Sequence, residues 1–403
     1  MMIALRHVRL IDGLGSVQER ATVVVKDDRI LSAGPSRSTT VPRGAVDLDV
    51  RGMTVLPGLI DCHVHLGLGG EPDVVTVVET DSPGMTLLKA ARYAEQTIGA
   101  GITTVRDVGY KGHGIFALKQ AIAAGLVLGP RVLAAGQAIC MTGGHARFIG
   151  READGPIEIV RAVREQLAAG ADLIKIIASG GVLTPGTSPD QAQFSLEEIR
   201  TAVQEAQRAG KQVAAHAHGA AGMKQAVAAG VRSIEHATLM DEEAAEALVQ
   251  HEVFIVPTLS ALATTAGCPL GAGVPESVVT KARDMSARHE ASFKKAHKRG
   301  VRIAMGTDAG TPFNYHGENA QELDRMVALG MSPMEAILSA TASAAALLGL
   351  DDRIGTIQPG KLADLIIVEG NPLKRIALLR DRNRLAGVML QGRLVSGPLA
   401  GEV

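Results

Sequence analysis

The stretch AGADLIKIIASGG, residues 169–181, has the form of one structural unit: a helix end, a glycine and a buried strand. A glycine directly after a helix suits the left-handed residue that closes it. The apolar run that follows is nearly continuous, as expected for a strand of a parallel sheet covered on both faces. A single charged residue, Lys175, interrupts this run.

The same unit recurs along the chain. A glycine precedes an apolar or β-branched run at Gly101, Gly125, Gly170, Gly210, Gly230 and Gly300. The long interval between the last two has room for one more strand and helix, and residues 54–65 (TVLPGLIDCHVH) supply a first strand. Eight strands, each followed by helical sequence, predict an α/β fold of the (β/α)8 TIM-barrel type over residues 55–349.

The two ends of the chain have a different pattern. Residues 1–54 and 350–403 contain short strand-like pieces separated by turn residues, and neither end is long enough for a good core alone. We therefore expect both termini to form one small composite β-sandwich domain in addition to the barrel domain of residues 55–349.

The composition argues against several classes of protein. The formal net charge of −1 gives no electrostatic footprint for nucleic acid or for an anionic membrane. The sequence has no apolar run long enough to span a membrane, and its N-terminus lacks a signal-peptide layout. Three cysteines without a CxxC pair fit a reducing compartment. We expect a cytoplasmic protein with a small-molecule substrate, and assembly into a homo-oligomer is left open.

Six polar side chains stand at or near the ends of the predicted strands. They are His63, His65, Lys175, His216, His236 and Asp308. The carboxyl ends of barrel strands carry the chemistry in enzymes of this fold. The first two histidines are spaced i, i+2, so they project to the same side of a strand. Imidazole is the commonest metal ligand, and the six together predict a metal site.

Taken singly, each position has a simpler interpretation. An isolated HxH pair is structural as readily as functional, and Asp308 could cap the helix that follows it. A lysine in a buried strand carries a heavy desolvation cost unless it is paired or altered. Lys175 could pair with Asp172, or burial could lower its pKa and let the amine react with CO2 to form a bridging carbamate.

Several motifs resemble the amidohydrolase superfamily, in particular the imidazolonepropionase-like and prolidase-like group of metal-dependent hydrolases. They are LPGLIDCHVHL, GITTVRD, TGGH, IKIIASGG, HAHG, SIEHATL, GTDAGTP and GTIQPGKLADLIIV, and they extend along the whole chain. The resemblance implies one divalent ion bound by His63 and His65 and a second bound by His216 and His236. Zn²⁺ is the expected ion, although Co²⁺ and Mn²⁺ also suit such ligands.

The resemblance also implies a reaction. Lys175 carboxylated by CO2 would bridge the two ions, and Asp308 would bind the first ion. A hydroxide shared by the two ions would attack a carbonyl carbon, while Asp308 would accept its proton and deliver it to the leaving nitrogen. The expected activity is hydrolysis of a C–N amide bond in a dipeptide or an N-acyl or N-aryl amino acid, as in a dipeptidase, prolidase or carboxypeptidase.

Other functions remain open at this point. The same centre could open a cyclic amide or a lactone, or cleave an organophosphate. A mononuclear deaminase would lack the lysine and would place an acid where this chain has HAHG, residues 216–219. A non-catalytic scaffold derived from a hydrolase would have lost ligands that this chain retains.

A second set of residues could contact the substrate. His145 could donate to a carboxylate or carbonyl, or could simply pack in its loop. His218 is on the same face as His216 and could stabilise an oxyanion; some prolidase-like relatives carry Tyr at this position, which leaves the substrate preference open. Arg147 and Arg151 could pair with a substrate carboxylate or be solvated.

The remaining histidines and one loop complete the expectations. His316 could shape the mouth of the site or cap a helix, and His113 is ambiguous. Surface positions are expected for His7, His251, His289 and His297. Residues 259–275 are nearly without charge and could form an apolar lid or a plain connecting loop. An apolar lid would favour a hydrophobic acyl or aryl group on the substrate.

Overall fold

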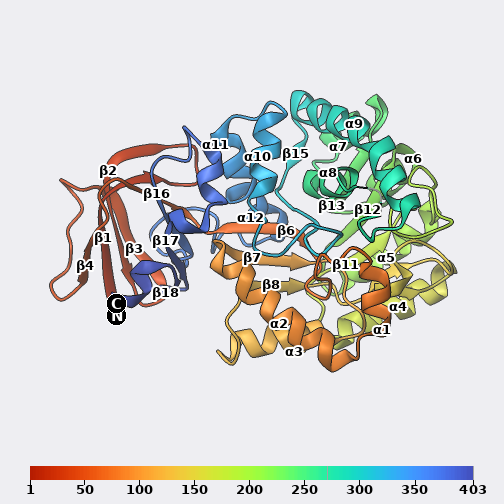
Figure 1. Cartoon of the computed structure of the whole chain (residues 1–403), viewed down its shortest axis with the longest axis horizontal. Helices are drawn as coiled ribbons and strands as arrows, with labels where there is room; N and C mark the ends of the chain where they lie inside the picture. The colour runs from red at the N-terminus through yellow and green to blue at the C-terminus, as the bar shows by residue number, and fades with distance from the viewer. Residues whose placement is uncertain (270, 403) are drawn as a thin grey trace. The chain divides into compact units, whose positions relative to one another are not determined.

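The computed structural model describes residues 1–269 and 271–402. Leu270, in the expected lid segment, and Val403, in the expected terminal domain, lie outside the described residues. The chain forms a mixed α/β structure with two compact units (Figure 1). The first comprises Met1–Asp61, Glu95–Thr104 and Gly317–Val403, and the second comprises Cys62–Ala94 and Val105–His316.

Both ends of the chain contribute strands to one sheet of the first unit. Within the described residues this sheet has eight strands in the order β18-β17-β16-β5-β1-β2-β3, with β4 paired to β1. Figure 1 shows the N-terminal strands in red beside the C-terminal strands in blue. The strands are β1 (Met2–Ile11), β2 (Val17–Lys26), β3 (Arg29–Pro35), β4 (Val46–Asp49), β5 (Met53–Pro57), β16 (Leu365–Glu369), β17 (Leu385–Leu390) and β18 (Arg393–Ser396).

Antiparallel pairing of β5 with β16 joins the two termini, with Leu56 opposite Ile366. One hydrophobic cluster covers this sheet and draws on both ends of the chain, including Leu5, Val23 and Ile367. The β-sandwich and the boundaries at residues 54, 55, 349 and 350 stay predictions.

The single strand expected over residues 54–65 is in fact two strands, β5 and β6 (Leu59–Val64). Pro57 has no amide hydrogen for a continuous ladder, and the amide of Gly58 instead donates to the carbonyl of Asp364 at 2.8 Å. A Cβ on Gly58 would lie 2.2 Å from the Thr103 hydroxyl, so only glycine fits this junction. The break lets β5 join the terminal sheet, while β6 carries His63.

The ligand-bearing strands belong to two further sheets. A seven-stranded sheet has the order β10-β9-β11-β12-β13-β14-β15 and is parallel throughout, and a three-stranded sheet has the order β6-β7-β8; both counts refer to residues 1–269 and 271–402. Their remaining strands are β7 (Ile102–Asp107), β8 (Arg131–Ala134), β9 (Ala138–Cys140), β10 (Gly150–Glu152), β11 (Ile174–Ile177), β12 (Val213–Gly219), β13 (Ser233–Leu239), β14 (Phe254–Val256) and β15 (Arg302–Ile303).

Backbone hydrogen bonds connect both edge strands of the three-stranded sheet, β6 and β8, to the chain beside strands of the seven-stranded sheet. The amide of Cys62 donates to the carbonyl of Met305 at 2.9 Å, and the amide of Asp172 donates to the carbonyl of Ala134 at 2.9 Å. Closure into a complete eight-stranded barrel stays a prediction.

Helices separate most of the parallel strands. They are α1 (Val74–Thr80), α2 (Pro83–Gly99), α3 (Gly114–Ala123), α4 (Gly155–Ala169), α5 (Leu196–Arg208), α6 (Ala220–Ala229), α7 (Glu242–Gln250), α8 (Leu259–Ala266), α9 (Glu276–Arg299), α10 (Gln321–Ala328), α11 (Pro333–Ser339) and α12 (Ala342–Leu348). Short 3-10 helices are η1 (Arg147–Ile149), η2 (Ile376–Leu379), η3 (Arg382–Arg384) and η4 (Pro398–Gly401). Among the described helices, none is both long and apolar enough to cross a bilayer.

The glycines that mark the repeated unit adopt the expected conformation. Their φ angles lie between 67° and 108°, at Gly101, Gly125, Gly170, Gly210, Gly230 and Gly300. Each follows a helix and precedes a strand, except that Gly125 is separated from β8 by a short turn. The prediction that these glycines close helices in the left-handed region is therefore confirmed.

Replacement of Gly170 isolates the cost of this conformation. A Cβ at this position would meet only the ring of Phe116, at 3.9 Å, so no clash contributes. Gly170→Ala should lower the free energy of unfolding by about 1 kcal/mol, because a left-handed φ is unfavourable for alanine. Gly170→Asn is the matched control and should lose less, since asparagine tolerates this region. Urea unfolding followed by circular dichroism measures both, and equal losses would contradict the backbone explanation.

Candidate metal centre

The structure brings all six predicted ligands into one cavity of the second unit, together with His145 and His218. The cavity is partly open to solvent, and its space together with the solvent at its mouth amounts to about 730 Å³. Strands β6, β11, β12 and β13 supply six of these eight side chains, or the residue just beyond the strand end. The other two are Asp308, which follows β15, and His145, which follows β9. The parallel strands thus present their ligand-bearing ends to one place.

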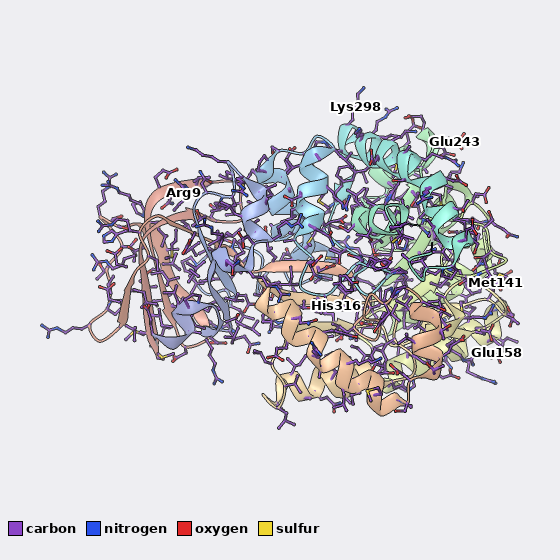
Figure 2. The ribbon with its side chains drawn as sticks, in the orientation of Figure 1. Arg9, Met141, Glu158, Glu243, Lys298 and His316 are labelled. Carbon is purple, nitrogen blue, oxygen red and sulfur yellow. The ribbon has the colours of Figure 1, made fainter. Side chains whose placement is uncertain are left out.

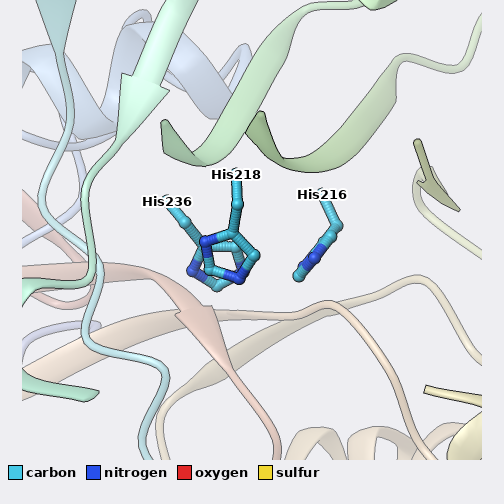
Figure 3. Close-up of side chains that lie close together, drawn as sticks. All are labelled: His216, His218 and His236. Atoms are coloured by element: carbon cyan, nitrogen blue, oxygen red, sulfur yellow. The ribbon is translucent and has the colours of Figure 1, made fainter. Parts of the chain in front are cut away.

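Two groups of candidate ligands stand out within the cavity. His63, His65 and Asp308 form the first group, and His216, His218 and His236 form the second; in each group the ligand atoms lie within 4.8 Å of one another. Figure 3 shows the second group, in which the rings of His218 and His236 stack with centroids 4.7 Å apart. The structure therefore adds His218 to the expected pair of His216 and His236.

The two groups are adjacent. The ring centroids of His63 and His236 are 4.9 Å apart. Within the first group, the Asp308 Oδ1 atom lies 3.5 Å from His63 Nε2 and 3.3 Å from His65 Nε2. One carboxylate oxygen thus faces both imidazoles of the HxH pair.

Lys175 lies on β11 and lines the same cavity. Its side chain is buried, and burial lowers its pKa to about 8. The simpler interpretation of this residue, a pair with Asp172, is not adopted: Asp172 binds the ammonium of Lys119 at 2.5 Å. In the part of the chain that the structure describes, no carboxylate forms an ion pair with Lys175.

Hydrogen bonds at the second ring nitrogen orient most of the histidines. His65 Nδ1 donates to the carbonyl of Gly109 at 2.8 Å, which leaves Nε2 for a ligand. Three other histidines pair their Nδ1 atoms with threonine hydroxyls at 2.7–2.9 Å: His236 with Thr258, His218 with Thr238 and His145 with Thr184. The ring of His216 has the opposite orientation. Its Nε2 lies 3.2 Å from the carbonyl oxygen of Gly180, so Nδ1 is the nitrogen that could bind a metal ion.

A buried carboxylate orients His63. Glu235 Oε2 lies 2.8 Å from His63 Nδ1, and the guanidinium of Arg106 contacts both oxygens of Glu235 at 2.8 and 2.9 Å. Burial alone would raise the pKa of Glu235. The charge of Arg106 and the hydrogen bond with His63 outweigh burial and hold the pKa well below its usual range. The carboxylate is therefore ionised and accepts from Nδ1, so that Nε2 of His63 faces the cavity.

Burial also sets the charge of the imidazoles. It lowers the pKa of His63 to about 4, and it lowers the pKa values of His216, His218 and His236 well below 6.5. His65 differs: burial lowers its pKa, but the hydrogen bond with Asp308, the charges of Asp308 and Asp107 and the carbonyl of Gly109 together raise it. The second group is thus neutral at physiological pH, which is the state in which imidazole binds a metal ion.

Comparison with known proteins agrees with this geometry. Residues 54–395 match the amidohydrolase family. The chain is 32% identical to the ochratoxinase of Aspergillus niger, over 97% of this chain and 86% of that protein. A solved Xaa-Pro dipeptidase with methionine bound in its active site is similar at a TM-score of 0.90 and 38% identity, covering 98% of this chain and 100% of that one.

A prolidase solved with N-methylphosphonate-L-proline is also similar, at a TM-score of 0.91 and 32% identity, covering 98% of this chain and 99% of that one. The chain belongs to the amidohydrolase family. Because its relatives are hydrolases of C–N bonds, this amidohydrolase is a hydrolase of the same kind.

Sequence reasoning missed the residues behind the ligands. Arg106 and Glu235 are both buried, and each stands inside an apolar strand, where an ionisable residue is costly unless paired. That cost indicates a buried partner for Arg106 and for Glu235, just as it does for Lys175. The threonines gave no comparable signal, because threonine is common in strands.

The surface position predicted for one histidine of this amidohydrolase is wrong. His289 was expected at the surface because charged residues surround it in sequence, but it is only 3% exposed. It lies on the buried face of α9 with Val278, Ala282 and Met285, at helical spacing. Its Nε2 donates to the carbonyl of His236 at 3.0 Å, so it supports the backbone of a candidate ligand.

Three other residues that could have contacted the substrate lie outside the lining of the cavity. His316, whose position is labelled in Figure 2, is buried, donates from Nε2 to the carbonyl of Leu68 at 2.9 Å and stacks on Tyr93. It is absent from the lining of the cavity, and the residue that caps α10 is Ala320. Arg147 is exposed, and the guanidinium of Arg151 binds Glu165 at 2.8 Å; neither lines the cavity. The remaining histidines are exposed or half-buried, namely His7, His113, His251 and His297.

The threonine behind His236 offers a test of ring orientation. Thr258→Val keeps the shape of the side chain but removes the hydroxyl that pairs with Nδ1. We expect metal affinity to fall by about tenfold, as found for other outer partners of ligating histidines. Thr258→Ser retains the hydroxyl and should stay close to the wild type. Chelator competition measures the affinity, and an equal loss in both variants would assign Thr258 a packing role instead.

Proposed function

We propose that this amidohydrolase uses two divalent metal ions to hydrolyse a C–N amide bond of a dipeptide or an N-acyl or N-aryl amino acid. The observation that carries the proposal is the meeting of two buried ligand groups and one buried lysine in a single cavity. A closed (β/α)8 barrel with a terminal β-sandwich is the scaffold that we propose for this site. A cytoplasmic location is part of the same proposal, and assembly into a homo-oligomer stays open.

The residues present suit such a centre. His63, His65 and Asp308 would hold one ion, and His216 and His236 would hold the other. Their donor atoms converge, and the rings are oriented by partners at the opposite nitrogen, as in many metal sites. When bound, two divalent ions, of which Zn²⁺ is the expected one, would lower the pKa of a water molecule and polarise the substrate carbonyl.

Lys175 would supply the bridging ligand after it is carboxylated. A pKa of about 8 leaves roughly a tenth of the amine neutral at pH 7, far more than for an ordinary lysine. The neutral amine would attack CO2, forming an N–C bond and releasing one proton, and the product is an anionic carbamate with two oxygens. The carbamate would then add a negative charge to the site and could serve both ligand groups.

Asp308 would handle the proton in the reaction. Burial raises its pKa, but the adjacent imidazoles of His63 and His65 lower it overall. The carboxylate is therefore ionised and able to accept a proton from the attacking water. It would then return this proton to the leaving nitrogen, which avoids expulsion of an unstable amide anion.

Two histidines would act on the substrate directly. His218 pairs its Nδ1 with Thr238, so its Nε2 is left to donate to the oxygen of the tetrahedral intermediate. His145 lies with its ring 4.7 Å from that of His216 and would contact the substrate at the opposite side. If His218 instead serves as a ligand within its group, this stabilising role falls to His145.

Metal reconstitution tests the proposed function. The full chain would be stripped with a chelator and reloaded with Zn²⁺, Co²⁺ or Mn²⁺ in bicarbonate, then assayed with dipeptides, N-acyl amino acids, lactones and phosphotriesters. We expect two ions per chain by elemental analysis and amide turnover that returns only with metal. Full turnover by the stripped protein, or preferred cleavage of a lactone or phosphotriester, would overturn the proposal.

Replacement of Lys175 tests the bridge. Lys175→Ala should bind fewer than two ions and should lose at least about 1,000-fold in kcat/KM, because several steps depend on the intact centre. Lys119→Ala removes a lysine from the Asp172 ion pair, outside the cavity, and should keep both properties. Wild-type turnover in Lys175→Ala would exclude the bridging role.

A further inference from the structure

Part of the lining of the cavity is apolar, and five of its side chains are called the apolar wall here. Leu68 follows β6, Phe148 belongs to η1, Val182 and Leu183 follow β11, and Leu262 lies on α8. The wall therefore comes from loops and short helices rather than from the strands that carry the ligands.

Two buried hydrophobic clusters support this wall. Leu68 and Phe148 belong to one cluster, which also contains Ile177 of the ligand-bearing strand β11. Val182 and Leu262 belong to a second cluster with residues of α9, and Leu183 packs against both. These clusters pack behind the wall, and well-packed interiors resist rearrangement.

The wall carries no charge of its own. Apart from the histidines, the ionisable side chains among the described residues that line the cavity are Lys175 and Asp308, which both belong to the candidate metal centre. The two arginines that could have received a substrate carboxylate lie elsewhere: Arg147 is exposed, and Arg151 is paired with Glu165. Lys281 is also engaged, donating to the carbonyl of Thr187 at 2.8 Å.

This distribution of charge selects among substrates. A carboxylate or ammonium placed against the wall would lose its water without gaining a counter-ion, which is costly. Each methylene buried there instead raises affinity by roughly fourfold. The gain and the penalty act in the same direction, because both favour an uncharged group.

We propose that this wall binds a large apolar, uncharged substituent of the amide substrate, so that amides with a charged group at that position are rejected. The inference rests on the proposed function and narrows it: N-acyl or N-aryl amides with hydrophobic substituents are the preferred class, and acidic or basic dipeptides are poor substrates.

A matched pair of amides tests the inference. N-hexanoyl and N-adipoyl amides of one amine have acyl chains of the same length, but the adipoyl chain ends in a carboxylate. The metal-loaded full chain should hydrolyse the hexanoyl amide with a kcat/KM higher by about 100-fold or more. The same comparison on the amine side uses amides of leucine and glutamate. Ratios near one on both sides would overturn the inference.

Binding provides a second measurement that does not depend on turnover. Hexanamide should bind the full chain at least about tenfold more tightly than adipamate, in titrations followed by calorimetry or NMR. If no amide is hydrolysed and this preference holds, the proposed function fails while the wall is assigned correctly. If amides are hydrolysed without a preference in either measurement, the wall is assigned wrongly while the function stands.

Substitutions inside and outside the wall test whether the preference for uncharged acyl groups arises there. Leu183 is partly exposed, so Leu183→Arg can place a cation at the wall without a fully buried charge. We expect the hexanoyl-to-adipoyl ratio of kcat/KM to fall by about tenfold or more. Leu126→Arg makes the same substitution at a position that is 81% exposed and outside the cavity, and it should leave the ratio unchanged. An unchanged ratio in Leu183→Arg, with folding verified by circular dichroism, would contradict the assignment.

Discussion

Burial of the ligand cluster is the constraint on which the rest of this site depends. Removal from water lowers the pKa values of most of its imidazoles, which are therefore neutral near neutral pH, and lowers the pKa of Lys175 to about 8, so that a minor fraction of its amine is neutral. The same burial makes every unpaired ring nitrogen costly. A carboxylate, carbonyl or hydroxyl must therefore stand behind the rings, and Glu235, Gly109 and Thr258 fill this role. The outer partners follow from the burial of the ligands that they support.

The backbone at the strand ends is strained in the same region. His236, Thr258 and Asp308 have φ angles of 72°, 53° and 60°, in the left-handed region that residues other than glycine rarely adopt. Each such residue costs on the order of 1–3 kcal/mol and persists only where the surroundings determine it. Here the surroundings are buried parallel strands, and the turn that they impose directs side chains from neighbouring strands toward one cavity.

The sequence predicts the candidate ligands but not the residues that support them. His63 and His65 are visible from strand spacing alone, and Lys175 from its cost in an apolar run. The partner of His63 is Glu235, which is 172 residues away, and no local pattern links the two positions. Their contact depends on how the strands are arranged in space. The surface position predicted for His289 is wrong for the opposite reason. Its helical spacing from apolar residues indicates burial, but the charged residues beside it in sequence suggest exposure.

The candidate ligands and the apolar wall come from different elements of the fold, so the chemistry and the selectivity of the site can change separately. Strands supply the candidate ligands, whose positions are coupled because a shift of one strand end would disturb hydrogen bonds to its neighbours. Loops and short helices supply the apolar wall, and a residue such as Leu183 contacts hydrophobic clusters without bonding to any ligand. Substitutions in the wall can therefore change which substituent is accepted at little cost to the centre. This separation is consistent with a family in which similar chains carry names as different as Xaa-Pro dipeptidase and ochratoxinase.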